Sequence, residues 1–220
     1  INRARPQVHS LLLRLMAERS ITAFNREHVF PHLLVFADRN RIEREETFEL
    51  PAAARDRFLM EIAIATPTDE ASRSALLFEP RFHDTDRLID QVSPSVLDHT
   101  ALNEIARELQ ETIFVSPTIK RYALDIWSAI RSPEAAGIQI PGVDMSRLVA
   151  GGASPRGMSY LIRAARVSAW LDGRDGVVPE DIRDVFSEVM AHRIFLAPVY
   201  ELRRDEIVRD LIKSVFERVP

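Results

Sequence analysis

The chain has 220 residues, of which 46% are hydrophobic and 28% charged, and this length suffices for one sizeable core or two small ones. It contains no cysteine, which excludes disulfides, thiol catalysis and cysteine metal sites and is compatible with the cytoplasm. Its formal net charge of −4 gives no overall field that favours nucleic acid, so we expect no nucleic-acid binding. Its apolar runs are far shorter than the roughly 20 residues of a membrane-spanning helix, so we expect no membrane insertion.

The first elements along the chain are a helix and a hairpin. Residues 6–18 begin with a proline and carry apolar side chains at helical spacing. Residues 20–31 alternate as in two short strands, with a turn expected at Asn25-Arg26. We therefore predict a helix followed by a β-hairpin.

Two apolar segments follow and predict strands of an α/β sheet. Residues 33–37 form a continuous apolar run typical of a buried parallel strand, and the mainly apolar residues 59–65 predict a second strand. Two such strands with one helix leave both sheet edges open and bury too little area. We therefore expect residues 1–66 to be an incomplete α/β domain whose missing part precedes Ile1.

From residue 67 to residue 220 the pattern becomes helical, which places a domain boundary near Thr66-Pro67. Each predicted helix carries an apolar stripe at 3.6-residue spacing. The predicted helices span residues 69–78, 101–113, 117–130, 155–172, 179–190 and 203–219. Residues 131–153 read as irregular, so the second domain is expected to be all-α.

The start of the helix at residue 155 has the features of an anion site. Ser154 suits the N-cap and Pro155 the first helical position. Arg156 falls in the first turn, where the helix dipole disfavours a cation by roughly 0.3–1 kcal/mol. Free backbone N–H groups beside an arginine suit a phosphate. The alternative is a solvated arginine that happens to follow a cap.

The phosphate cradle itself is not found in this sequence. Gly137 and Gly142 have the glycine spacing of a P-loop, but Val143-Asp144 stands where Lys and Ser/Thr are required. Two other polar residues stand near apolar segments. Asn40 lies three residues past the run 33–37, where α/β proteins place ligand-binding groups, and Arg57 precedes the run at Phe58. Their alternatives are a loop asparagine bonded to its own backbone and a surface arginine paired with Asp56.

Five segments, taken together and in this order, closely resemble the MoxR family of AAA+ ATPases. They are Ile1-Asn2-Arg3-Ala4, Met16-Ala17-Glu18-Arg19, Leu50-Pro51 with Asp56-Arg57-Phe58-Leu59-Met60, Gly152-Ala153-Ser154-Pro155-Arg156 and Val178-Pro179-Glu180-Asp181-Ile182. The resemblance runs to about Arg193 and implies that the chain starts just after the Walker B acidic pair. The implied fold is α/β plus all-α: the second half of an AAA+ P-loop α/β core over residues 1–66, followed by a helical lid domain over residues 67–220.

The resemblance also implies roles for three residues. Asn40 matches the sensor 1 residue that orients the attacking water, and Arg57 matches the arginine finger that reaches into a neighbouring subunit's site. Arg156 matches the sensor 2 arginine of the lid, which touches the nucleotide of its own subunit. Arg55 is an alternative finger. Asp38-Arg39 and Arg41 stand in place of the family's usual residues around sensor 1 and make this loop more charged.

The expected function follows from this resemblance. The intact protein should hydrolyse ATP with Mg²⁺ as a homo-oligomeric ring, a hexamer, and act in chaperone-like maturation or remodelling of client or adaptor proteins in the cytoplasm. This chain alone should be inactive, because it has no cradle for the phosphates. The alternative is a non-enzymatic helical scaffold or protein-interaction module with vestigial ATPase features.

Overall fold

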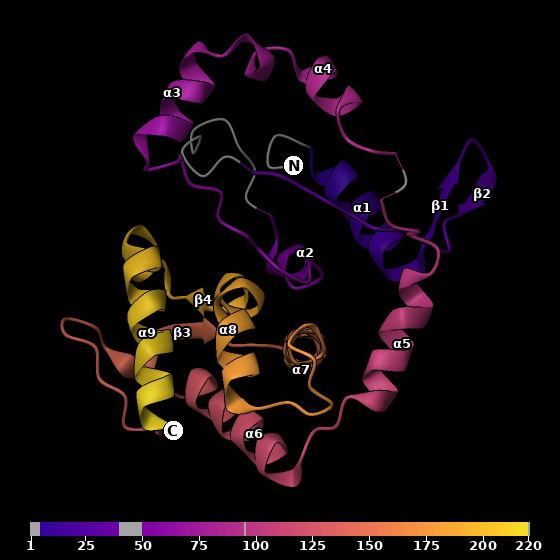
Figure 1. The fold of residues 1–220 in the computed structure, drawn as a ribbon. Coiled ribbons are helices and arrows are strands. Elements are labelled where there is room, and N and C mark those ends of the chain that lie inside the picture. Colours follow the sequence, from indigo (N-terminus) through magenta and orange to yellow (C-terminus); the bar gives the residue numbers. More distant parts are fainter. Residues whose placement is uncertain (1–4, 40–49, 95, 220) are drawn as a thin grey trace.

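The computed structural model describes residues 5–39, 50–94 and 96–219 (Figure 1). It begins with α1 (Pro6–Glu18), as predicted, and a two-stranded antiparallel hairpin of β1 (Ser20–Ala23) and β2 (Arg26–Val29). Ala23 pairs with Arg26, so the turn is Phe24-Asn25, one residue earlier than predicted. Both turn residues have positive φ, 52° and 59°, as a two-residue hairpin turn of type I′ requires.

The two predicted sheet strands are the main difference between expectation and structure. Neither 33–37 nor 59–65 forms a strand, and the sheets within the described residues are two small antiparallel pairs. Phe36 is 91% exposed and Ile64 is 96% exposed, so the prediction of a buried strand at 33–37 is wrong for this structure. An apolar run becomes a strand only when neighbouring strands satisfy its backbone, and no such neighbour lies beside these segments in the described part of the chain.

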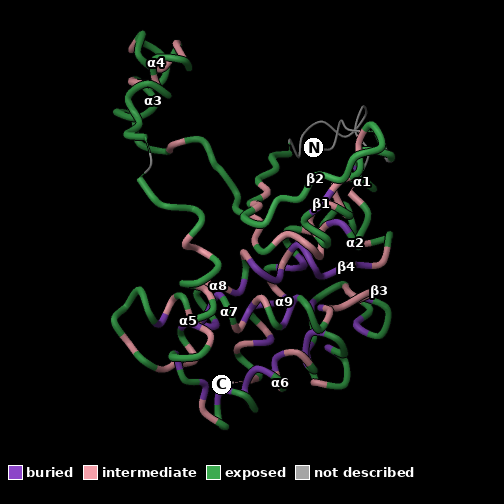
Figure 2. The backbone as a smooth tube through the Cα atoms, turned by 90° about the vertical axis from the view of Figure 1, so that its right-hand side faces the viewer, coloured by how far each residue is buried: buried purple, intermediate pink, exposed green. Residues whose placement is uncertain are grey.

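The N-terminal half is open rather than packed around a core. The described chain exposes 15184 Å² to solvent, whereas a folded monomer of this mass exposes about 10,300 Å². Among the described residues before Leu109, only His9, Ser20 and Ala54 are buried. Figure 2 shows the same contrast, with buried backbone gathered in the C-terminal half.

Three short helices follow the hairpin and carry little buried surface. The first, α2 (Ala52–Arg55), lies beside the C-terminal half and contacts it. The next two, α3 (Glu70–Phe78) and α4 (Thr85–Asp90), stand at the far end of the molecule from the lid helices (Figure 1) and contain no buried residue. A 3₁₀ turn over Pro80–Phe82 joins them, and α5 (Leu102–Thr112) leads back to the lid.

The lid is the part of the chain that has a continuous core. Its helices are α6 (Pro117–Arg131), α7 (Pro155–Leu171), α8 (Pro179–Met190) and α9 (Arg204–Arg218). The 3₁₀ turns η2 (Met145–Arg147), η3 (Ala191–Arg193) and η4 (Pro198–Arg203) and the small pair β3 (Val149–Gly151) and β4 (Phe195–Leu196) connect them. The segment 131–153, expected to be irregular, therefore contains η2 and the whole of β3.

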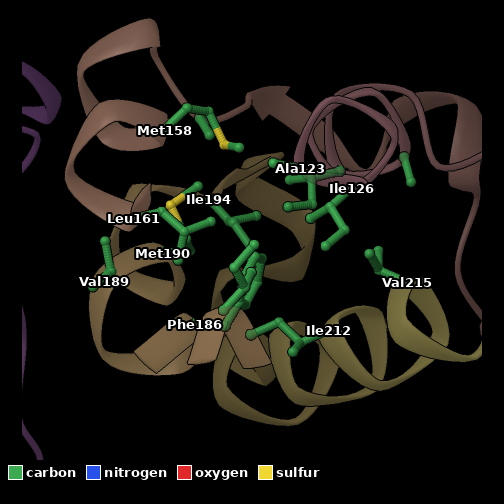
Figure 3. Packing of buried hydrophobic residues seen from close by; sticks show 14 of the residues in the cluster. Ala123, Ile126, Met158, Leu161, Phe186, Val189, Met190, Ile194, Ile212 and Val215 are labelled. Atoms are coloured by element: carbon green, nitrogen blue, oxygen red, sulfur yellow. The ribbon is translucent and has the colours of Figure 1, made fainter. Parts of the chain in front are cut away.

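The core of the lid is built where the helix stripes predicted it. Fully buried Ile126, Leu161 and Phe186 come from α6, α7 and α8, and α9 closes the core with Ile207 and Leu211. Figure 3 shows Phe186 at the centre of this packing. No helix among the described residues is long and apolar enough to cross a bilayer.

Candidate functional site

A cavity of about 920 Å³ lies between the N-terminal half and the lid. It is lined by parts of α1, by residues 33–35 and 57–60, and by the facing sides of α5 and α7. Its lining includes Arg19, Arg57, Arg156 and Arg163, and no Asp or Glu is among its described lining residues. The remaining walls are mostly apolar. The cavity thus suits a ligand that combines an anionic group with an apolar one.

Arg156 stands in the first turn of α7, at the rim of this cavity. The predicted cap is confirmed, because the Ser154 hydroxyl accepts the Gly157 N–H at 3.0 Å. The Arg156 guanidinium donates to Asp56 Oδ2 at 3.0 Å, and its side chain is 47% exposed. In this structure a carboxylate therefore stands where a phosphate was expected.

Arg57, one residue past Asp56, lines the same cavity as Arg156. Its Nη1 donates to the Ala53 carbonyl at 2.7 Å, while its buried Nε has no hydrogen-bond partner. Asp56 is paired with Arg156 and Arg193 instead, so the alternative of an Arg57–Asp56 surface pair is wrong. Arg57 retains an unused donor beside a cavity that is suited to anions.

The other two predicted residues are placed differently. Arg55 donates from Nε and Nη2 to the His192 carbonyl at 3.3 and 3.0 Å, and its guanidinium lies 4.9 Å from the centre of the Phe195 ring. These two hydrogen bonds and the ring contact are made with the lid. Asn40 lies outside the described residues, so its role stays a prediction.

Asp56 and Arg193 form a contact centre that sequence reasoning missed. The Asp56 carboxylate accepts the Ser154 hydroxyl at 2.7 Å, and its Oδ1 lies 3.3 Å from Arg193 Nε. Arg193 is fully buried and donates to the carbonyls of Asp56 and Leu59 at 3.1 and 3.2 Å, and also to those of Phe58 and Val189.

Gly157 leaves the space that Arg193 fills. A Cβ on Gly157 would lie 2.6 Å from Arg193 Cδ, so only glycine permits this approach. The one sequence signal for this centre is that Arg193 stands between an apolar helix stripe that ends at Met190 and the apolar run that begins at Ile194, a setting in which a charge needs partners.

His192, next to Arg193, is expected to make folding stability depend on pH. Burial and the neighbouring Arg193 charge lower its pKa to about 4. Between about pH 6.5 and 4 the unfolded chain therefore binds a proton that the folded chain does not bind. Stability from this group is present above pH 6.5 and decreases as the pH falls, by about 2 kcal/mol at pH 5.

The measurement is urea unfolding of the chain and of a His192→Gln variant at pH 7 and pH 5. The variant should lose about 2 kcal/mol less free energy of unfolding between the two pH values than the parent chain. An equal loss in both proteins would contradict a depressed pKa at His192, because the other titrating groups are common to both.

Comparisons with known proteins agree with this architecture. Residues 1–60 match a family described as ATPase family associated with various cellular activities (AAA). Residues 144–213 match the AAA lid domain. The two matches fall on the segment that carries Arg57 and on the lid that carries Arg156 and Arg193.

Individual relatives give the same result. The chain is 64% identical to Protein MoxR of Methylorubrum extorquens over 220 residues, which is 100% of this chain and 64% of that protein. It is 58% identical to Protein MoxR of Paracoccus denitrificans, again over the whole chain and 65% of that protein. It is 36% identical to Chaperone MoxR1 of Mycobacterium tuberculosis, covering 96% of this chain and 53% of that protein. The chain thus spans just under two thirds of the two MoxR proteins.

A solved structure supports the fold class. The crystal structure of a suspected ATPase from Cytophaga hutchinsonii matches with a TM-score of 0.77 at 28% identity, covering 97% of this chain and 63% of that one. This match and the two family matches confirm the predicted class, part of an AAA+ α/β core followed by a helical lid. The chain belongs to the MoxR family of AAA+ ATPases.

Proposed function

We propose that the full-length protein hydrolyses ATP as a homo-oligomeric ring, a hexamer, and uses the energy to mature or remodel client proteins in the cytoplasm. The observation that carries this proposal is the cavity that Arg57 and Arg156 share with two further arginines and no described carboxylate. A relative named as a chaperone, MoxR1, supports the remodelling role. We assign residues 1–66 to the α/β core and residues 67–220 to the lid domain, whose packed part, called the lid above, is formed by α6 to α9 and follows the exposed helices α3 and α4.

In this proposal the two arginines act on different nucleotides. Arg156 leaves Asp56 to bind the phosphates of its own subunit, and Arg57 contacts the γ-phosphate in the neighbouring subunit. Arg57 is preferred to Arg55 as the finger because Arg55 is bonded to the lid through His192. Asn40 orients the attacking water.

Mg²⁺ is implied by the family, and the described residues fit the phosphates better than the metal. Besides Arg57, which this proposal assigns to the neighbouring subunit's nucleotide, the cavity offers the guanidinium groups of Arg19, Arg156 and Arg163 for anionic oxygens. The described residues contain no group of three or more His, Asp or Glu that suits a metal ion. When bound with ATP, Mg²⁺ would neutralise charge on the phosphate oxygens. We propose that this chain alone is inactive, since its sequence contains no P-loop motif.

The test is nucleotide binding and hydrolysis by the full-length protein and its Arg156→Ala variant. Loss of one charge-assisted contact to phosphate should weaken ATP affinity by about 10- to 100-fold. Arg121→Ala is the matched control, because Arg121 is an exposed arginine that is paired with Asp125 on α6 and does not line the cavity. Absence of ATP hydrolysis by the parent protein would overturn the ATPase proposal, and unchanged affinity in the variant would overturn the role of Arg156.

A further inference from the structure

The segment that carries Arg57 is bonded to the lid of its own subunit. We propose that Arg193 and Asp56 lock this finger segment, residues 51–61, onto the lid and thereby position Arg57 for the neighbouring site. Arg193 and Asp56 are positioning residues in this scheme, since neither one needs to touch the nucleotide. The inference rests on the proposed function, and it assigns to the lid a second task beyond carrying Arg156.

Arg193 fixes the backbone on both sides of Arg57. Its guanidinium donates to the carbonyls of Asp56, Phe58 and Leu59, which lie immediately before and after Arg57. The rigid fork of an arginine can satisfy several carbonyls at once, which a lysine ammonium does with less geometric control. Because Arg193 is fully buried, these bonds are not exchanged for bonds to water, and their loss would leave a buried charge with too few partners.

Further contacts extend the lock along the segment. Arg55 donates twice to the His192 carbonyl, and the Glu61 N–H donates to the Glu188 carbonyl at 2.8 Å. Ala54 of α2 is buried, which is rare among the described residues of the N-terminal half. The preceding segment 33–37 has no comparable set of lid contacts and is largely exposed. The finger segment is thus held by the lid far more firmly than the segment that precedes it.

Asp56 links the finger segment to α7, the helix whose first turn carries Arg156. Its carboxylate accepts from the Ser154 hydroxyl and from Arg156 at the start of α7. A phosphate that draws Arg156 away from Asp56 therefore changes the contacts of the residue next to Arg57. The nucleotide state of one subunit would then be transmitted to the finger that this subunit presents to its neighbour.

The experiment compares Arg193→Lys and Arg55→Gln with Arg204→Gln in the full-length protein. Arg204 is the matched control, because it is a partly buried arginine whose described polar contacts lie outside the finger segment. It donates to the Ala191 carbonyl at 2.7 Å and is paired with Glu201. We expect kcat to fall at least tenfold in the first two variants, with ATP affinity within twofold of the parent. Arg204→Gln should keep both values. A fall in affinity equal to the fall in kcat would overturn the positioning role.

Mixing and hydrogen exchange separate this inference from the proposed function. Arg193→Lys mixed with Arg156→Ala should regain turnover, because some sites then combine an intact sensor arginine with a well-placed finger. Arg57→Ala is mixed with Arg156→Ala in parallel. If Arg57→Ala regains turnover and Arg193→Lys does not, the positioning role is wrong. If neither variant regains turnover, Arg57 does not act in the site of a neighbouring subunit. Amide hydrogen exchange of residues 56–61 should be at least tenfold faster in Arg193→Lys and Arg55→Gln than in Arg204→Gln. Equal exchange rates would overturn the proposed lock. This result does not depend on whether the protein is an ATPase.

Discussion

Arg57→Ala in the full-length protein is expected to reduce ATP turnover by about 10³- to 10⁵-fold while leaving ATP affinity nearly unchanged. An arginine finger stabilises charge that develops on the γ-phosphate in the transition state, so its loss affects the rate much more than ground-state binding. In this structure Arg57 lines the cavity, and its Nη1 donates to the Ala53 carbonyl rather than to a carboxylate. The measurements are the steady-state rate and the binding of a non-hydrolysable ATP analogue.

The same variant tests whether the finger acts between subunits. Arg57→Ala and Arg156→Ala are each expected to be impaired, and mixing them should restore turnover, since some sites then receive one intact arginine from each subunit. Arg57 and Arg156 line a single cavity in one chain, so failure to recover would indicate that both act on the same nucleotide. Arg55→Ala distinguishes the alternative finger: its ATP turnover should fall less than that of Arg57→Ala, because the Arg55 guanidinium is bonded to the His192 carbonyl of the lid. An equal or greater fall would favour Arg55 as the finger.

The longer helices were predictable because their determinants are local, whereas the short α4 was not predicted. Ser116 and Ser154 cap α6 and α7 through backbone N–H groups three residues away, and each helix buries a stripe set by its own 3.6-residue period. These features are complete within one helix and its flanks. Their bounds therefore agree with the sequence to within one or two residues.

The hairpin strands β1 and β2 were predicted, but the fate of the two apolar segments 33–37 and 59–65 was not predictable from the same kind of pattern. The apolar runs 33–37 and 59–65 indicate a preference for burial, but a strand also needs partners for its N–H and C=O groups. Those partners are set by the rest of the sheet, and a single segment carries no information about whether they are present. Phe36 and Ile64 consequently stand almost fully exposed.

The site was predictable in part. Arg156 was singled out from its capped helix start and Arg57 from its place before an apolar run, and the family resemblance assigned their roles; the bonds that hold them were not predicted. Asp56 bonds to Ser154 and Arg156 across 98 and 100 positions, and Arg193 bonds back to Asp56 across 137. A single sequence does not reveal pairs at such separations. The structure therefore adds the positioning contacts to a pair of residues already expected.

Phe186→Ala is expected to lower the free energy of unfolding of the lid by about 3–5 kcal/mol. Phe186 is fully buried among the lid helices, and its ring meets that of Phe216 edge to face at 4.9 Å between centres. Truncation removes the buried area and leaves a cavity that a close-packed core cannot fully close. Urea unfolding followed by tryptophan fluorescence measures the effect, because Trp127 and Trp170 both lie in lid helices.

The control is Phe24→Ala, which removes the same atoms from a side chain that is 100% exposed at the tip of the hairpin. Its effect on unfolding should stay within about 0.5 kcal/mol. The contrast follows from the distribution of buried residues, since the continuous core begins at Leu109. A loss below about 1 kcal/mol for Phe186→Ala, or a comparable loss for Phe24→Ala, would contradict a stability that resides in the lid. Because Arg193 and Asp56 bond the finger segment to this lid, a stable lid is also the condition for a well-placed Arg57.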